Sequence, residues 1–349
     1  MTLFLEILTG LLILFTVLSL IRHEFWMFRV FDYPRLQKFM ATAIALLLVL
    51  CFYKGELIGF YLLTGLLGAN LVYLGIQIAP FTVIGSKQVL KAHAELPDQS
   101  ISIMIANVYQ DNVNCGGCLK EVENHDPDLV LLLETNKRWF DNTLSLEKKY
   151  PFQVRIPLEN TYGMLLYSRL ELVSPEVNYL VEDDIPSIST GVLLPGGKQV
   201  QLYCLHPTPP VPNENPRSTE RDKELLLVAE QAKACTDPVI VIGDLNDVAW
   251  SYTTELFLKM SGLLDPRRGR GFFNSFHAHY PFMRFPLDHA FISTDFKLKH
   301  MKRVHNFDSD HFPIYIALQY EQIADQQQES MDATAADIQA AEEKKQAAT

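Results

Sequence analysis

Three long apolar runs fill most of the first 79 residues and constrain what this 349-residue chain can fold into. They cover residues 3–21, 39–53 and 57–78 and contain few charged side chains. A helix needs roughly 20 apolar residues, and at least about 17, to cross the bilayer core. The first and third runs suffice, and the second can borrow flanking residues. The sequence therefore predicts an N-terminal membrane segment of three helices over residues 1–79, with Lys54-Gly55-Glu56 as a hairpin tip.

The flanks of these runs bear on orientation. No Lys or Arg precedes the first run, and no small-residue cleavage pattern follows it before Arg22-His23-Glu24, which disfavours a signal peptide. Basic residues gather in the first loop and after the third span, whereas the second loop holds only Lys54. The six residues on the richer side are Arg22, Arg29, Arg35, Lys38, Lys87 and Lys91. By the positive-inside rule we expect a multi-pass protein with its C-terminal part in the cytoplasm.

Charge and cysteine content exclude several classes of protein. The net charge is -11, and the acidic excess lies after residue 79. Such a chain lacks the broad basic surface of a tight duplex-DNA binder, although a bound cation can still reverse the local field for a phosphate substrate. Five sparse cysteines argue against a disulfide scaffold. Cys115-Gly-Gly-Cys118 has redox or metal-knuckle spacing, but no second such pair accompanies it, so we expect two plain thiols.

The rest of the chain divides into three parts. Residues 80–100 have a mixed composition and suit a linker. Short β-rich runs alternate with helix-like stretches over residues 101–320, which predicts an α/β domain with two packed sheets. Residues 321–349 are rich in Gln, Ala and Glu and contain no aromatic residue, so we expect a disordered or weakly helical tail. Residues 1–79 are expected to anchor the domain and to add little to its chemistry.

Polar residues follow or precede six of the apolar strands. They are Asn107, Glu134, His206, the run Asp244-Leu245-Asn246-Asp247, Asp288 and the run Ser309-Asp310-His311. Any one of them could be an ordinary turn or helix cap. Together they indicate one sheet edge rich in carboxylates, amides and imidazoles, which suits Mg²⁺ or Mn²⁺ and a phosphate ester. The chain has no P-loop, no HExxH motif and no GxSxG elbow.

The ordered set of Asn107, Leu133-Glu134-Thr135, His206, Gly243-Asp244-Leu245-Asn246, Leu287-Asp288-His289 and Ser309-Asp310-His311 resembles the endonuclease/exonuclease/phosphatase superfamily. The resemblance covers residues 101–320. It implies a two-layer β-sandwich flanked by helices, an α/β/β/α arrangement of the DNase type. The membrane segment, with runs at residues 31–35 and 269–273, looks like a bacterial membrane-anchored branch, which implies the inner membrane.

The resemblance also implies a metal site and a substrate rim. Glu134 would hold Mg²⁺ or Mn²⁺ with Asn107 beside it, and Asp310 would support this site or a second ion. Among residues near the site, Arg217, Arg270 and Asn274 are candidates for substrate binding. The loop around Arg270 is both basic and aromatic, so it suits a nucleic-acid backbone, a lipid headgroup or solvent.

Catalytic roles follow from the same resemblance. Asp244 would orient or deprotonate the attacking water, and Asn246 would contact the phosphoryl oxygens. His311, oriented by Asp288, would bind phosphate or transfer a proton, because a carboxylate partner fixes the tautomer of an imidazole. His206 would contact the phosphate or the leaving group.

These expectations predict a membrane-anchored, divalent-metal-dependent phosphoesterase that hydrolyses a phosphodiester or phosphomonoester by in-line attack of an activated water. A metal-dependent nuclease acting on DNA or RNA is the alternative enzyme. A membrane scaffold with an inactive hydrolase domain is the alternative outside enzymes. The expected partners are the bilayer and a phosphate ester, which could be a lipid headgroup, a small molecule or a nucleic acid, and the sequence indicates no protein partner.

Overall fold

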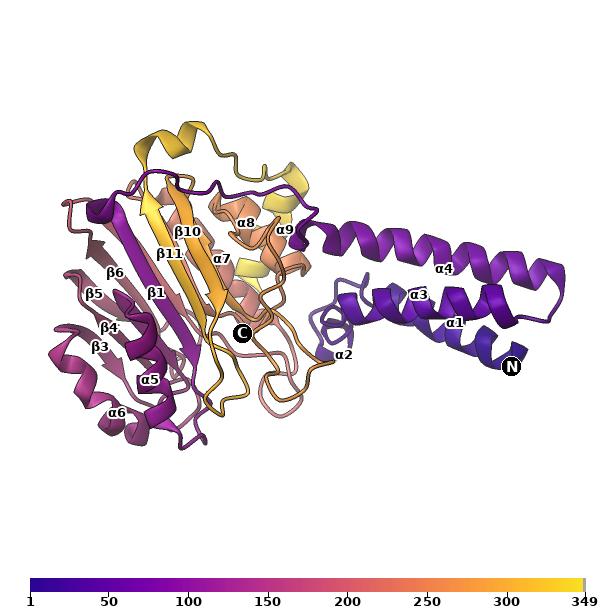
Figure 1. The fold of residues 1–349 in the computed structure, drawn as a ribbon, viewed down its shortest axis with the longest axis horizontal. Helices are drawn as coiled ribbons and strands as arrows, with labels where there is room; N and C mark the ends of the chain where they lie inside the picture. Colours follow the sequence, from indigo (N-terminus) through magenta and orange to yellow (C-terminus); the bar gives the residue numbers. More distant parts are fainter. Residues whose placement is uncertain (348–349) are drawn as a thin grey trace.

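Two mixed β-sheets stack face to face in the computed structural model, which describes residues 1–347 (Figure 1). The six-stranded sheet has the order β10-β11-β1-β2-β4-β3, and the five-stranded sheet has the order β5-β6-β7-β8-β9. The strands are β1 (Ser100–Asn107), β2 (Leu129–Leu133), β3 (Phe152–Ile156), β4 (Met164–Ser168), β5 (Leu172–Asn178), β6 (Ser187–Leu193), β7 (Gln199–Leu205), β8 (Val239–Asp244), β9 (Asp288–Ile292), β10 (Phe296–Arg303) and β11 (Ile314–Tyr320).

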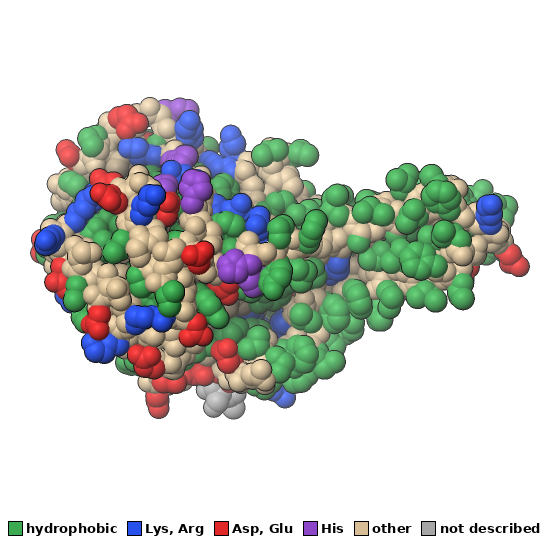
Figure 2. Space-filling model, turned by 60° about the horizontal axis from the view of Figure 1, so that its bottom comes forward, with side chains coloured by type: hydrophobic (Ala, Val, Ile, Leu, Met, Phe, Trp, Pro, Cys, Tyr) green, Lys and Arg blue, Asp and Glu red, His purple; other side chains and the backbone are tan. Residues whose placement is uncertain are grey.

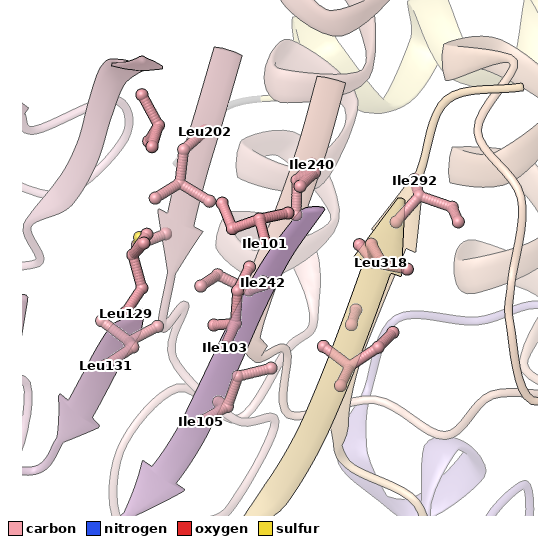
Figure 3. Packing of buried hydrophobic residues seen from close by; sticks show 14 of the residues in the cluster. Ile101, Ile103, Ile105, Leu129, Leu131, Leu202, Ile240, Ile242, Ile292 and Leu318 are labelled. Carbon is pink, nitrogen blue, oxygen red and sulfur yellow. The ribbon is translucent and has the colours of Figure 1, made fainter. Parts of the chain in front are cut away.

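The main core lies between the two sheets, where side chains of alternate residues meet (Figure 3). Ile103 and Ile105 of β1 point into this core, while Met104 and Ala106 point to the opposite face of the same sheet. Both faces of β1 are therefore buried, which explains its nearly continuous apolar sequence. The outer faces are covered by α5 (Cys115–His125) and α6 (Lys137–Thr143) on one sheet and by α7 (Thr219–Ala234) and α8 (Tyr252–Ser261) on the other. The predicted α/β/β/α sandwich is confirmed.

The polar tail was expected to be disordered or weakly helical, and part of it is helical. Residues 335–346 form helix α9 (Ala335–Gln346), which begins with a capping box between Thr334 and Asp337. The helix packs against α7 and α8 through the buried side chain of Ala341. Lys344 Nζ lies 2.7 Å from the buried carboxylate of Asp222. Composition left disorder and a weak helix as alternatives, because ion pairs and one small residue dock this helix in place of an apolar stripe.

Helices α1 (Thr2–Leu18), α3 (Arg35–Phe52) and α4 (Leu57–Ile78) form a bundle that projects from the sandwich (Figure 1). Only α3 and α4 are long and apolar enough to be candidate membrane spans, so the prediction of three spans is wrong. Helix α1 has 17 residues and is shorter than α3, with 18 residues, and α4, with 22 residues.

The bundle turns its apolar side chains outward. Most exposed large hydrophobic residues of the protein lie within residues 1–79, and Figure 2 shows hydrophobic side chains spread over the projection. Polar groups lie inside instead, where Asn70 Nδ2 of α4 donates a hydrogen bond to Thr42 Oγ1 of α3 at 3.0 Å. An apolar outside is unfavourable in water and favourable in a bilayer.

The segments on either side of α3 and α4 pack on the sandwich. Before α3, the short helix α2 (Trp26–Arg29) follows Phe25, which forms a β-bridge with Arg217. After α4, Phe81 packs edge-on against Trp250, with ring centroids 5.8 Å apart. Farther along, Val89 is fully buried in the core between the sheets. Residues expected to be a linker are thus part of the packed domain.

Candidate active site

Six strand ends meet at one edge of the sandwich because of the sheet topology. Strands β1 and β2 are parallel, as are β7 and β8, so their C-terminal ends lie on the same side. Strands β9 and β11 run antiparallel to β8 and β1 and begin where those strands end. The register pairs Asp244, the last residue of β8, with Asp288, the first of β9. Motifs far apart in the sequence therefore face one cavity.

His311 lies between two carboxylates. Its Nδ1 is 2.8 Å from Asp288 Oδ2, and its Nε2 is 3.5 Å from Asp244 Oδ2. Burial by itself disfavours the imidazolium, but the charges of Asp288 and Asp244 outweigh this and raise the pKa of His311 to about 10. The Ser309 hydroxyl accepts a hydrogen bond from the His311 backbone N–H and fixes the start of this loop. The side chain of His311 is therefore a positioned proton donor at neutral pH.

Asn107 connects the carboxylates of Glu134 and Asp244. Its Nδ2 donates to Glu134 Oε1 at 2.7 Å and to Asp244 Oδ2 at 3.1 Å. Its Oδ1 accepts a hydrogen bond from the Tyr109 backbone N–H, so the amide nitrogen and not the oxygen faces the carboxylates. In this orientation Asn107 holds the acidic residues in place, whereas the sequence suggested it as a metal ligand.

Glu134 follows β2 with a φ of 57°, a left-handed conformation that is uncommon outside glycine. Burial raises its pKa to about 7, and the nearby charge of Asp310 acts in the same direction. Its Oε2 accepts a hydrogen bond from the Gln110 backbone N–H at 3.2 Å. A cation beside this buried carboxyl group would stabilise its charged form.

The site can accommodate a metal ion on the chemistry of its donors. One ligand atom each of Asp244, Asp288 and His311 lies within 4.8 Å of the others, which makes this group a possible metal site. Asp310 Oδ1 is buried without a hydrogen-bond partner among the described residues, and Asp310 lines the same cavity as Glu134 and Asp244. Carboxylate oxygens of this kind fit a hard divalent cation. A protonated His311 is a poor ligand, so the oxygen donors are the better candidates.

The turn after β8 depends on close backbone packing. Gly243 has a φ of 147°, and a Cβ there would lie 1.9 Å from the Leu205 carbonyl oxygen. Asn246 has a φ of 49°, and its Nδ2 donates to the Pro207 carbonyl at 2.9 Å. Its own carbonyl accepts hydrogen bonds from Tyr33 Oη and Arg221 Nη1. The Gly-Asp-Leu-Asn motif is thus a rigid turn that aims Asp244 and Asn246 at the cavity.

His206 lies beneath the cavity and does not line it. The imidazole is buried, with its ring centroid 5.2 Å from that of Tyr162. Burial lowers its pKa to about 4, so the ring is neutral at physiological pH. Its Nδ1 has no hydrogen-bond partner among the residues described, which leaves it free for a small polar molecule.

The three residues expected to bind substrate lie elsewhere. Arg217 is exposed beside Phe25, and Asn274 is not among the residues around the cavity. Arg270 donates to the backbone carbonyls of Val89 and Pro266. The loop from Arg267 to Arg270 holds the segment after α4 against the sandwich, because Gly269 N–H also donates to the Pro80 carbonyl. These basic side chains therefore serve packing, which local sequence could not reveal.

A cavity of about 690 Å³ joins the acidic edge to the N-terminal segment. At one end lie Glu134, Asp244, Asn246, Asp310 and His311. The opposite wall includes Phe15, Trp26, Val30, Phe31 and Tyr33, all of which precede α3. Residues 1–79 were expected to add little to the chemistry, but they supply a wall of the candidate active site. The sequence signal was the run at residues 31–35, whose position beside the site could not be foreseen.

A family model described as Endonuclease/Exonuclease/phosphatase family matches residues 112–311, and the chain belongs to this family. Members of the family are usually phosphoesterases or nucleases and typically depend on a divalent metal. A comparison with curated protein sequences gives no match.

Solved structures share the fold at low sequence identity. Zebrafish (D. rerio) TDP2 in complex with a single-stranded DNA product is 18% identical, with a TM-score of 0.54 over 63% of this chain and 99% of that one. An endonuclease/exonuclease/phosphatase from Beutenbergia cavernae is 17% identical, with a TM-score of 0.52 over 64% and 72%. The human Nocturnin catalytic domain with bound sulfate is 16% identical, with a TM-score of 0.51 over 65% and 96%. These likenesses cover 63% to 65% of this chain and show the sandwich fold.

Proposed function

We propose that this protein is a membrane-anchored phosphoesterase that uses Mg²⁺ or Mn²⁺ and hydrolyses a phosphate ester by in-line attack of water. The observation that carries the proposal is the arrangement of Glu134, Asp244 and Asp310 around one cavity with the Asp288–His311 pair. Three acidic side chains beside an imidazolium suit a cation and a phosphoryl group together.

Each of these residues would have a separate role in hydrolysis. Glu134 and Asp310 would hold the cation, with Asn107 fixing the position of Glu134. A bound divalent cation would neutralise charge on the phosphoryl oxygens. Asp244, hydrogen-bonded from Asn107 and from the Asn246 backbone, keeps a carboxylate ready to orient a water molecule or accept its proton. His311 would donate a proton toward the phosphoryl or leaving oxygen, while Asp288 keeps the ring in place.

Anchoring by α3 and α4 is supported by their length and by the outward apolar surface of the bundle. The charge bias of the loops favours a catalytic domain on the cytoplasmic side, and the resemblance to a bacterial membrane-anchored branch suggests the inner membrane. A reporter that works only in the cytoplasm, fused after Thr349, should be active. Activity from a reporter that works only in the periplasm would reverse this orientation.

The activity is tested with the full chain in detergent or nanodiscs. We expect release of p-nitrophenol from bis-p-nitrophenyl phosphate or from p-nitrophenyl phosphate, its loss in EDTA, and its return with Mg²⁺ or Mn²⁺. The two esters separate phosphodiesterase from phosphomonoesterase activity. A parallel assay with plasmid DNA and RNA tests the nuclease alternative. No hydrolysis in any arm, with metal present and the protein folded, would favour the inactive scaffold.

A further inference from the structure

The cavity next to the acidic edge has an apolar wall that a small polar phosphate ester does not need. Val30 and Phe31 from the N-terminal segment line the same cavity as Met283 and Phe285 from the loop before β9. Val30 is 47% exposed and Met283 53% exposed, so the wall continues to the cavity mouth. Apolar surface left open at a mouth indicates a ligand or environment that covers it.

The wall is firmly attached to the catalytic domain. Tyr33 Oη donates to the Asn246 carbonyl at 2.9 Å, and Trp250 Nε1 donates to the Asp32 carbonyl at 2.9 Å. Asp32 is buried between the side chains of Arg29 and Arg35. The ring of Phe31 also packs on that of Phe15 in α1, with centroids 5.1 Å apart. These contacts hold the wall at a fixed position relative to Asp244 and His311.

The basic side chains of this wall form ion pairs and hydrogen bonds with neighbouring groups of the N-terminal segment. Arg29 pairs with Asp32 at 3.1 Å and donates to the carbonyls of Ile21 and His23. Lys38 Nζ donates to Ser19 Oγ and to the carbonyls of Phe15 and Phe31. A groove for a nucleic-acid backbone needs free basic side chains along it. This wall offers aromatic and aliphatic surface instead, which favours a hydrocarbon chain.

The cavity is continuous with the outward apolar surface of the bundle. Phe15 lines the cavity and is also 38% exposed on α1, beside the other outward side chains of that helix. Figure 2 shows hydrophobic side chains reaching from the projection onto its junction with the sandwich. A molecule with an apolar tail can therefore pass from the bundle surface to the acidic edge without leaving an apolar environment.

We propose that the substrate is an amphiphilic phosphate ester, a membrane lipid whose phosphate meets the acidic edge and whose hydrocarbon part lies along the wall of Val30, Phe31 and Met283. This rests on the proposed phosphoesterase function. In the reaction the oxygen of water forms a bond to phosphorus and the ester P–O bond breaks. The water loses a proton, and the departing alkoxide gains one to leave as an alcohol.

A series of alkyl p-nitrophenyl phosphates tests the wall directly. The full chain in phosphatidylcholine nanodiscs is given the methyl, butyl, hexyl and octyl esters below their micelle concentrations. Burial of a methylene is worth about 0.8 kcal/mol, so kcat/KM should rise about threefold to fourfold with each added methylene until the cavity is filled. A flat series with metal-dependent turnover would overturn the lipid assignment while leaving the phosphoesterase function intact.

A matched pair of variants locates the effect. Val30→Ser combined with Met283→Ser should lower the ratio of octyl to methyl kcat/KM by about tenfold, because the wall loses apolar surface. Val177→Ser, on β5 and away from the cavity, changes a similarly exposed valine and should leave the ratio as in the wild type. An unchanged ratio in the double variant would contradict the proposal that the alkyl chain of the substrate lies along this wall.

Natural lipids complete the experiment. Vesicles of phosphatidylcholine that contain phosphatidic acid or phosphatidylglycerol should release inorganic phosphate from the first or a glycerol-containing product from the second. Turnover of either lipid in preference to plasmid DNA supports the proposal. A kcat/KM for DNA above that of the octyl ester would contradict the lipid assignment. If no ester is hydrolysed in a metal-dependent way, both the lipid assignment and the proposed phosphoesterase function fail.

Discussion

The sandwich and the helical bundle place their hydrophobic residues in opposite ways. In the sandwich, Ile103 and Leu131 have no exposed surface, and polar groups collect at the strand ends. In the bundle, Leu47 is 61% exposed and Ile58 80% exposed, whereas Asn70 is buried against Thr42. Buried apolar side chains suit a sandwich surrounded by water, whereas outward apolar side chains suit a bundle surrounded by hydrocarbon.

The junction between them buries charged side chains, so it resembles neither the sandwich nor the bundle in how its residues are distributed. Residues 25–38 bury the charge of Asp32 between two arginines. The Asp32 carbonyl accepts a hydrogen bond from Trp250, and the Tyr33 hydroxyl donates one to the Asn246 carbonyl. Burial raises the pKa of Asp32, while the neighbouring arginines act against that change. A buried ion pair contributes little net stability, but removal of one partner is costly. The junction therefore specifies an orientation, and the predictions below separate its contribution from those of the two regions.

The largest expected effect lies wholly in the sandwich. Asp244→Asn and His311→Ala should each lower kcat by about 10²-fold to 10⁴-fold, because each removes an acid–base group. Membrane association should change little by comparison, whereas the melting temperature of His311→Ala should fall because the buried Asp288 carboxylate loses its partner. Turnover of a soluble ester by purified variants in nanodiscs is the measurement. Wild-type turnover in either variant would remove that residue from the mechanism.

A backbone change should unfold the sandwich and spare the bundle. Gly243→Ala places a Cβ against the Leu205 carbonyl, so the turn after β8 must move, at a cost of about 3 kcal/mol or more. Gly10→Ala is the matched control, because a Cβ there meets nothing within 4 Å. Urea unfolding followed by tryptophan fluorescence should show the loss, since Trp139 and Trp250 are buried in the sandwich. Equal midpoints for the two variants would contradict the close approach.

The next largest effect is expected on the affinity for the metal ion. Glu134→Gln should raise the Mg²⁺ concentration for half-maximal activity by about tenfold or more, because a neutral amide is a weaker ligand than a carboxylate. Asp141→Asn changes an exposed acid on α6 and serves as the control. An unchanged half-saturation point for Glu134→Gln would make this residue a structural element of the strand end.

The pH dependence of stability tests a buried acid in the sandwich that has no cation beside it among the described residues. Burial raises the pKa of Glu224 to about 8 from an ordinary 4.5, and the charge of Glu182 adds to this. The folded state favours the protonated acid, so its contribution to stability falls as the pH rises from about 4.5 to about 8. Glu224→Gln should therefore gain in melting temperature relative to wild type as the pH rises from 5 to 9. A constant difference would contradict the burial of this carboxyl.

The smallest effect tests the junction. Tyr33→Phe removes a hydrogen bond to the Asn246 carbonyl, worth about 1 kcal/mol, but Arg221 still donates to the same oxygen. We expect a melting temperature lower by a few degrees and a modest loss of activity. Tyr179→Phe, an exposed tyrosine, is the control. A loss as large as that of Asp244→Asn would give Tyr33 a direct catalytic role.

The strand-end motifs could be predicted because their geometry is local. A polar residue that ends a buried strand lies at the sheet edge, and parallel pairing brings Asn107 and Glu134 to the same edge. Long loops have no such rule. Arg270 was expected at the substrate, but the loop folds back to hold the segment around Val89. Whether a basic side chain meets substrate or backbone depends on contacts between distant segments.

The N-terminal part shows the same limit. Apolar composition located the helices, but it could not show that α1 ends too early to count as a span. Nor could it place Tyr33 beside Asn246, more than 200 positions away. The docking of the polar helix α9 could not be predicted, because it depends on Lys344 and Asp222, which are far apart in the chain.

The double attachment of the sandwich, through residues 25–33 before α3 and through Phe81 after α4, restricts its tumbling. A domain on one flexible tether samples all orientations, whereas one fastened at two points turns only together with its helices. A substrate that diffuses in the plane of the membrane then meets the active site by a two-dimensional search. At each encounter the sandwich has the same orientation toward the substrate. Selection by the depth of the scissile bond along the membrane normal would follow from this attachment alone, without any added recognition of a headgroup.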